Sequence, residues 1–565
     1  MNTRIFKSLR TAATLLACFL IVGSAFPQSR SSAADDGSKD PLLVALKIEL
    51  ARSKEKLKLE NEKRPYFIEY TVTASQSYNA EAVFGAMRRE GESRVRFLRA
   101  VVRVGDYKLD SNQGRGDGAS ELIPLDDDPI AIRQQVWLAT DAAYKQAIES
   151  LTAKQARLKQ IEIEYPVDDF APASPVTSIG PLLTLDIGGE TARKHWREVL
   201  INASNVFRTD DKIQSFSTSL NFSVLNYYLI NTEGTTLRKS RESYSLSLSG
   251  SSQAPDGMRI DRGRAYSAAK LSELMSAEKF KAEAEKTIAS LAALRAAPIV
   301  EDHYQGPVLF SPDAAADVFH DLVGNNVLGS RPPLGSPART TTEYTNYFHS
   351  RVLPEFITVV DDPSISTFSG TTLFGHYDVD DEGVPAQTVT VVDKGKLQSY
   401  LVGRIPIRDF PASNGHGRNG AGSTQPAMST LVVKSSETVS PADLEKKLLD
   451  MCKDRGLPFG YYVETLGGLT NPRLLYKVYV KDGHRELVRG ARFGDLDRRT
   501  LRSDLAAVGN DATLDNRGGG IAMSMIVPSI LIDEMEVRRD NTTKEKLPQY
   551  GPPSLVDAVP AKTGN

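Results

Sequence analysis

The spacing of apolar residues changes along this chain, and that change limits its fold more than any other feature. The early part carries long stretches with apolar residues three and four positions apart, the spacing of one helix face. From Lys212 onward apolar and polar residues alternate, as in antiparallel strands with one buried face. This order predicts an α+β protein, with an N-terminal half of α/β type that has long helices and a mostly antiparallel β C-terminal half.

The same patterns predict individual elements. In the first half they predict helices at residues 40–63, 132–161, 190–206 and 271–294, and strands at 66–74, 93–104, 213–222, 227–231 and 243–249. In the second half they predict helices at 312–323 and 441–455, and strands at 308–310, 356–360, 387–392, 429–433 and 474–480.

Ala296-Ala297-Pro298 interrupts the last helix of the first half and sets the main domain boundary. We expect an N-terminal α+β domain over residues 40–298 and a C-terminal domain over 299–540. A Ser/Ala/Asp-rich linker at 26–39 precedes them, and a loose tail at 541–565 follows.

The first 25 residues have the pattern of a secretory signal peptide. Arg4, Lys7 and Arg10 precede an uncharged apolar run, which ends in the small residues Gly23-Ser24-Ala25. We therefore expect an exported protein, periplasmic or secreted, whose mature chain begins near Phe26. The alternative is an uncleaved membrane anchor, because the uncharged run approaches the ~20 residues that span a bilayer.

Cysteine content and charge exclude two further classes of protein. Of 565 residues only Cys18 and Cys452 are cysteines, so the mature chain has one thiol and no internal disulfide. Cys452 lies at helical spacing with Leu444 and Leu448, which predicts a small buried residue. The net charge of −2 provides no basic field for nucleic acid, and we expect no nucleic-acid partner.

A helix start is encoded at Ser311-Pro312-Asp313, with Ser311 as N-cap and Pro312 in the first turn. Gly324 is expected to end this helix in the left-handed conformation. His320 and Asp321 lie on its last turn. On spacing alone, such a histidine is more typical of a surface group near a helix C-terminus than of a metal ligand.

The segment 319–325, Phe-His-Asp-Leu-Val-Gly-Asn, resembles the His-Glu-x-x-x-His segment of the TldD/PmbA family, zinc metallopeptidases once described as modulators of DNA gyrase. The resemblance continues in four later segments, in the same order as in the family: residues 375–387, 391–397, 482–490 and 527–534. It implies a TldD/PmbA-type C-terminal half that acts on or binds peptides.

The departures from the family fall on its metal site. The resemblance implies that His320 is the first zinc ligand, that Asp321 stands at the position of the general base, and that Asn325 replaces the second histidine. The family's third ligand, a later cysteine, is missing between Asp511 and Ser529. Because a catalytic zinc uses three protein ligands, we expect zinc to be weakly bound or absent here.

Two functions remain open at this stage. The favoured one is a zinc-deficient partner subunit, because three zinc-site positions are altered together; the resemblance also implies members without the zinc motif that pair with one that has it. The partners would then be a peptide or unfolded polypeptide and a second subunit, in a homodimer or in a heterodimer with a family sibling. The alternative is an active zinc metallopeptidase whose ligand set is rebuilt with His376 or His416.

Other candidate groove residues lie in an acidic segment and a glycine-rich one. Asp380, Asp381 and Glu382 imitate the start of a calcium loop, but Val389 stands at its twelfth position, so a solvated acidic turn is favoured. Four glycines surround His416 in residues 411–423, which favours a mobile surface loop over a lid.

Overall fold

The computed structural model describes residues 37–112, 118–420, 423–494, 496–540 and 544–553. The signal peptide predicted at 1–25, and most of the predicted linker, lie outside these residues. No helix within the described ranges has the length and apolar character needed to cross a membrane. Of the predicted tail, Glu545 is paired with the N-terminal half, where its backbone N–H donates to the Gly257 carbonyl at 3.0 Å.

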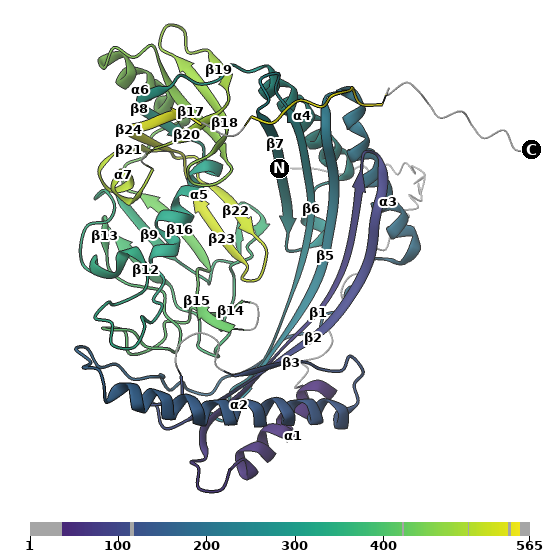
Figure 1. Ribbon diagram of the computed structural model, residues 1–565, viewed down its shortest axis with the longest axis vertical. Coiled ribbons are helices and arrows are strands. Elements are labelled where there is room, and N and C mark those ends of the chain that lie inside the picture. Colours follow the sequence, from purple (N-terminus) through teal and green to yellow (C-terminus); the bar gives the residue numbers. More distant parts are fainter. Residues whose placement is uncertain (1–36, 113–117, 421–422, 495, 541–543, 554–565) are drawn as a thin grey trace, which may run out of the picture.

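The N-terminal half is built on one sheet with unusually long strands. Its order is β3-β2-β1-β5-β6, and the far edge of β6 pairs with β4 at one end and with β7 at the other. The strands are β1 Pro65–Val83, β2 Ala86–Val104, β3 Ala119–Leu122, β4 Thr177–Ile179, β5 Ile213–Asn231, β6 Thr236–Gln253 and β7 Arg259–Ala268. Figure 1 shows this sheet as a curved wall along one side of the molecule.

Helices cover the outer face of this sheet. They are α1 Pro41–Lys56, α2 Pro129–Leu158, α3 Gly189–Ser204 and α4 Ala277–Ala296, with short 3₁₀ helices η1 Asn205–Thr209 and η2 Leu271–Glu273. Alternate strand residues such as Tyr78, Phe216 and Leu246 form one core with α3 and α4. Tyr70 and Ile230 belong to a second core with α1 and α2. Alternate side chains of β5 and β6 are therefore buried under helices, whereas in β2 burial begins only at Leu98.

The inner face of the sheet is turned toward the C-terminal half and changes character along the strands. Ser217, Ser219 and Ser223 of β5 stand opposite serines of β6 and remain partly accessible. Toward the other end of β5, Tyr227 and Leu229 pack against Val379 of the C-terminal half. The two halves thus meet through an apolar contact at one end of the sheet and leave a polar surface at the other.

The C-terminal half contains two larger sheets and two short hairpins. One sheet has the order β13-β12-β9-β16-β23-β22, and the other has the order β19-β18-β17-β8-β24-β20 with β21 also on β24. All neighbours are antiparallel except β16–β23 and β17–β8. The strands are β8 His303–Phe310, β9 Ile357–Asp361, β10 Thr367–Phe368, β11 Thr371–Thr372, β12 Val389–Asp393, β13 Lys396–Leu397, β14 Gly417–Gly420, β15 Ser423–Pro426, β16 Thr430–Ser435, β17 Phe459–Leu466, β18 Pro472–Tyr479, β19 Arg485–Val488, β20 Ala491–Phe493, β21 Leu505–Val508, β22 Thr513–Arg517, β23 Met523–Val527 and β24 Ile530–Arg539.

One helix, α5 (Pro312–Leu322), occupies the centre of this half. It packs against β17, β22 and β23, and so touches both sheets. Val318, Leu322 and Val323 are buried in the largest core of the protein, as the sequence predicts. The other helices of this half are α6 Pro441–Asp454, α7 Arg498–Ser503, η3 Gly324–Asn326 and η4 Glu343–Asn346. Cys452 is buried on α6, which confirms its prediction.

The α+β class is confirmed, while several element boundaries differ from the predictions. The first helix ends at Lys56 rather than near residue 63, because Leu59 is 38% exposed and the following residues have no apolar face to bury. The strands predicted at 213–222 and 227–231 are one strand, β5. Strand β7 and most strands after residue 480 were not predicted, since each is short or polar and is stabilised by neighbours distant in the sequence.

Gly324 does not adopt the left-handed conformation that the sequence predicts. Its φ is not positive, and the chain continues from Val323 into the 3₁₀ turn of η3. A Cβ atom at this position would lie 2.2 Å from the sulfur of Met428. The glycine is therefore required by close packing and not by backbone conformation.

Candidate functional site

The end of α5 carries the three residues that the resemblance assigns to a metal site. Ser311 caps the helix and accepts a hydrogen bond from the Ala314 N–H, so the last turn presents His320 and Asp321 together. The Nδ1 atom of His320 lies 2.7 Å from Oδ1 of Asp321. The Asn325 side-chain amide donates to the same oxygen at 3.4 Å. These side chains therefore bind each other.

This arrangement does not fit the three-ligand set of a catalytic zinc. Within the described part of the chain, no three His, Cys, Asp or Glu side chains lie close enough together to hold a metal ion. The next carboxylate on the helix, Asp317, is engaged by Arg517 of β22 at 2.7 Å. The fold does bring β22 and β23 against α5. A third metal ligand would have to come from these two strands or from the segment between them. The segment between these two strands offers glycines at 518–520 instead.

In the acidic segment 380–382, Asp380 is fully buried and Asp381 and Glu382 are half-buried, so the prediction of a solvated turn is wrong. Asp380 is fully buried and accepts three backbone N–H bonds, from Glu382 at 2.9 Å, Val384 at 2.8 Å and Gly417 at 2.9 Å. Carboxylate oxygens that are satisfied by backbone donors fix a tight turn. Backbone N–H groups of the protein therefore bind the Asp380 carboxylate, in the role that a cation has in a calcium-binding loop.

Asp381 joins this turn to the N-terminal sheet. Lys239 of β6 forms an ion pair with the Asp381 carboxylate and also donates to the carbonyl oxygens of Val379 and Asp380, both at 2.9 Å. Tyr227 of β5 donates its hydroxyl to the Asp381 carbonyl at 2.8 Å. Burial alone would raise the pKa of Asp381, but the charges of Lys239 and Arg418 hold it well below its usual range. No local pattern predicts Lys239, because its partner is 142 residues away.

Glu382 has the opposite electrostatic environment. Its carboxylate lies against Gly403 and Gly417, where no added Cβ would fit, and accepts the Arg404 backbone N–H at 2.6 Å. Burial, and then the negative charge of Asp380, raise the pKa of Glu382 to about 8. At neutral pH this turn therefore holds a proton on Glu382.

His416 and His376 lie in different surroundings. His416 is fully buried, and its Nε2 lies 3.0 Å from Oδ1 of Asp361. Asp361 also accepts bonds from Ser429, so the carboxylate stands between the serine and the imidazole and no serine–histidine nucleophile pair is formed. His376 is exposed, with Nδ1 2.9 Å from the Pro363 carbonyl.

The glycine-rich segment around His416 differs from the mobile surface loop predicted for it. Its described part forms the hairpin of β14 and β15, and Arg418 is buried with its guanidinium 4.4 Å above the Tyr377 ring. Gly417 is required because a Cβ there would lie 2.1 Å from the Glu382 carboxylate. The glycines thus allow close packing over the acidic turn.

Comparison with known proteins agrees with this architecture. Residues 303–539 match the PmbA/TldA metallopeptidase C-terminal domain. The TldE structure from Thermococcus kodakarensis has a TM-score of 0.56 at 15% identity and covers 87% of this chain and 99% of that one. Two proteins described as candidate modulators of DNA gyrase, from Thermotoga maritima and Bacteroides thetaiotaomicron, give TM-scores of 0.55 and 0.57 at 14% identity, over 87% of this chain and 99% and 98% of theirs. At such identities these structures show the fold alone.

Curated relatives match shorter stretches of the chain. The metalloprotease TldD homolog of Buchnera aphidicola is 27% identical over 113 residues, which are 20% of this chain and 21% of the relative. Metalloproteases of Archaeoglobus fulgidus and Methanocaldococcus jannaschii are each 29% identical, over 23% and 29% of this chain and 27% and 33% of their own. The matches thus span a fifth to a third of these relatives. Fold and matched domain together define a metallopeptidase-like protein of α+β class. Residues 303–539 form a domain of the PmbA/TldA metallopeptidase type, and the chain shares its overall fold with the TldE structure.

The raised pKa of Glu382 predicts a pH-dependent stability. Below about pH 4.5 the carboxyl is neutral in both folded and unfolded chains; between there and pH 8 only the folded chain keeps the proton, so stability falls as pH rises. Glu382→Gln is expected to remove most of this fall, measured by urea unfolding from pH 5 to 8.5. The matched control is Glu437→Gln, at an exposed glutamate. Parallel pH curves for wild type and Glu382→Gln would contradict the prediction.

Proposed function

We propose that this protein is an exported, peptide-binding TldD/PmbA-type subunit that lacks a zinc centre of its own and works with a second subunit of the family. The proposal rests chiefly on the end of α5, where His320, Asp321 and Asn325 bind one another. Export is supported by the signal-peptide pattern of residues 1–25.

The energetics of zinc binding support the metal-free assignment. Structural zinc sites with a full ligand set contribute about 10–16 kcal/mol in small peptides. One imidazole that is already bonded to a neighbouring carboxylate retains little of that free energy. An amide in place of the second imidazole is a weak ligand for zinc. The fold of α5 is kept by its buried stripe and its Ser311 cap, neither of which needs a metal.

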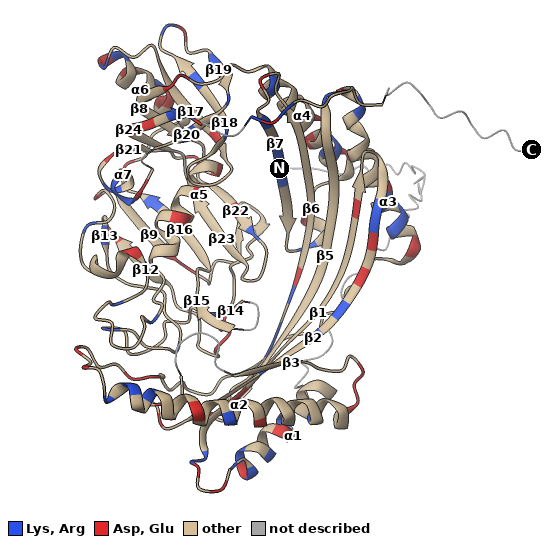
Figure 2. Cartoon of the chain, viewed as in Figure 1, with Lys and Arg blue, Asp and Glu red and all other residues tan. Residues whose placement is uncertain are grey.

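A subunit contact is supported by apolar side chains that the N-terminal half leaves exposed. Ile130, Trp137 and Leu138 of α2 are 75%, 39% and 46% exposed, and Leu122 of β3 is 64% exposed. Such residues are costly on a monomer's surface and are typical of protein interfaces. Charges elsewhere are interspersed, and Figure 2 shows acidic and basic residues mixed over both halves. We assign this surface of α2 and β3 to the second subunit.

The first prediction from this proposal concerns metal content. The purified mature chain is expected to contain well below one zinc per chain by mass spectrometry of the metal, after dialysis against zinc-free buffer, because one imidazole ligand cannot retain it. His320→Ala should leave that content unchanged. One tightly held zinc per chain that is lost in His320→Ala would overturn the assignment.

The second prediction separates a scaffold from an active site. His320→Ala and Asp321→Ala are expected to leave complex formation and thermal stability nearly unchanged. Leu322→Asp should reduce the free energy of unfolding by several kcal/mol, because it buries an unpaired charge in the main core. Leu322→Met, which conserves volume, is the control. Metal-dependent cleavage of an unfolded polypeptide by the wild-type chain alone, lost in Asp321→Ala without unfolding, would establish the alternative peptidase function.

The third prediction tests the subunit surface. Wild-type protein, alone or mixed with a zinc-holding family member, is expected to sediment as a dimer in analytical ultracentrifugation. Ile130→Asp should weaken association at least tenfold because it places a charge in an apolar contact. Leu182→Asp is the control, since Leu182 is also exposed (53%) but lies outside this surface. A wild-type chain that remains monomeric in both experiments would refute the partner role.

A further inference from the structure

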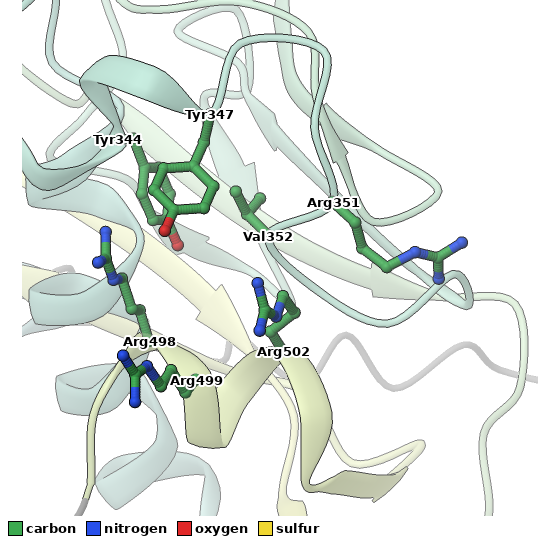
Figure 3. Close-up of a pocket in the computed structure, with 7 residues that line it drawn as sticks. All are labelled: Tyr344, Tyr347, Arg351, Val352, Arg498, Arg499 and Arg502. Atoms are coloured by element: carbon green, nitrogen blue, oxygen red, sulfur yellow. The ribbon is translucent and has the colours of Figure 1, made fainter.

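A cationic cavity lies in the C-terminal half, between α7 and the segment that contains η4 (Figure 3). Its volume is about 350 Å³, within the range of small-molecule sites. The lining residues are Tyr344, Tyr347, Arg351, Val352, Arg498, Arg499 and Arg502. Four of these seven are arginines, and no residue of the zinc-motif segment is among them.

The arginines of α7 are not neutralised equally. Arg498 pairs with Glu343, its Nη1 donating to the Glu343 carbonyl at 3.1 Å, and its guanidinium lies 4.8 Å above the Tyr347 ring. Arg351 has a partner in Glu355, 3.3 Å away at the surface. Among the described residues, none forms an ion pair with Arg499 or Arg502. The cavity therefore has an excess of positive charge, which favours an anionic ligand.

Tyr344 supplies a second, independent observation. The residue is 1% exposed, and its hydroxyl has no hydrogen-bond partner among the described residues. Figure 3 shows the two tyrosine hydroxyls directed toward the arginines. Tyr400 fixes the position of the Tyr344 backbone, because its hydroxyl donates to the Tyr344 carbonyl at 2.6 Å. Buried hydroxyls are nearly always satisfied in native proteins, so this donor points to a ligand acceptor.

We propose that this cavity binds a small phosphorylated molecule, with its phosphoryl oxygens between Arg499, Arg502 and the Tyr344 hydroxyl. A tetrahedral phosphoryl group offers several oxygens in different directions, which matches donors that approach from α7 and from the η4 segment. A planar carboxylate offers only two. Guanidinium groups bind phosphoryl oxygens in pairs of hydrogen bonds. The tyrosine rings leave room for an organic part of the ligand.

The test is calorimetric titration of the full chain with pyrophosphate at low salt, with inorganic phosphate and citrate as comparisons. Wild-type protein is expected to bind pyrophosphate at least tenfold more tightly than citrate. Arg499→Gln and Arg502→Gln should each weaken binding about tenfold or more. Arg492→Gln, an exposed arginine of β20 outside the cavity, should have no effect and controls for net charge.

Tyr344→Phe distinguishes a ligand contact from a structural role. Removing an unpaired buried hydroxyl should leave thermal stability unchanged or higher, while pyrophosphate binding weakens severalfold. Three outcomes would overturn the proposal: no binding of pyrophosphate at millimolar concentration, tighter binding of citrate, or equal losses in Arg499→Gln and Arg492→Gln. None of these outcomes depends on the zinc or partner assignments.

Discussion

Lys239 carries its ammonium group from the N-terminal sheet into the acidic turn of the C-terminal half, where an unpaired charge would be strongly destabilising. Its three acceptors, one carboxylate and two carbonyls, fix the turn at a definite distance from β6. Arg404 repeats this arrangement nearby: its guanidinium is 1% exposed and binds the Ala171 carbonyl and Glu233 of the N-terminal half. Because removing either partner would leave a buried charge, the two halves are held in one relative position.

These contacts of Lys239 and Arg404 between the two halves also determine which segments of the chain lie around α5. The acidic turn also supports β14, whose Gly417 packs against Glu382. Arg241, two residues after Lys239, reaches the carbonyl oxygens of Gly519 and Gly520 at 3.3 and 3.4 Å, in the loop between β22 and β23. The N-terminal sheet therefore contacts the segment that would have to supply a third metal ligand.

The sequence predicted the fold class, the position of α5 and its cap, and the burial of Cys452, because each depends on residues close together in the chain. Ser311-Pro312 and the spacing of Val318 and Leu322 are sufficient to place a helix. The burial of the acidic turn and the surroundings of His376 and His416 could not be predicted in this way. Asp381 and Lys239 are far apart in the sequence, and three carboxylates in a row look solvated unless their partners are known. For the same reason the unpaired hydroxyl of Tyr344 had no signal in the sequence.

The long strands have a consequence for how this chain can vary. β1 and β5 pair without a bulge from Glu69–Asn231 to Val83–Ser217, with one set of side chains under helices and the other on the inner face, which is polar at one end and apolar at the other. A single inserted or deleted residue within this span would exchange the two faces beyond it, moving Phe222 into the place of a serine. Within this paired span a change of length therefore needs a compensating β-bulge, whereas the turns tolerate it more easily. That restriction is consistent with a shared fold over 87% of the chain at only 15% identity.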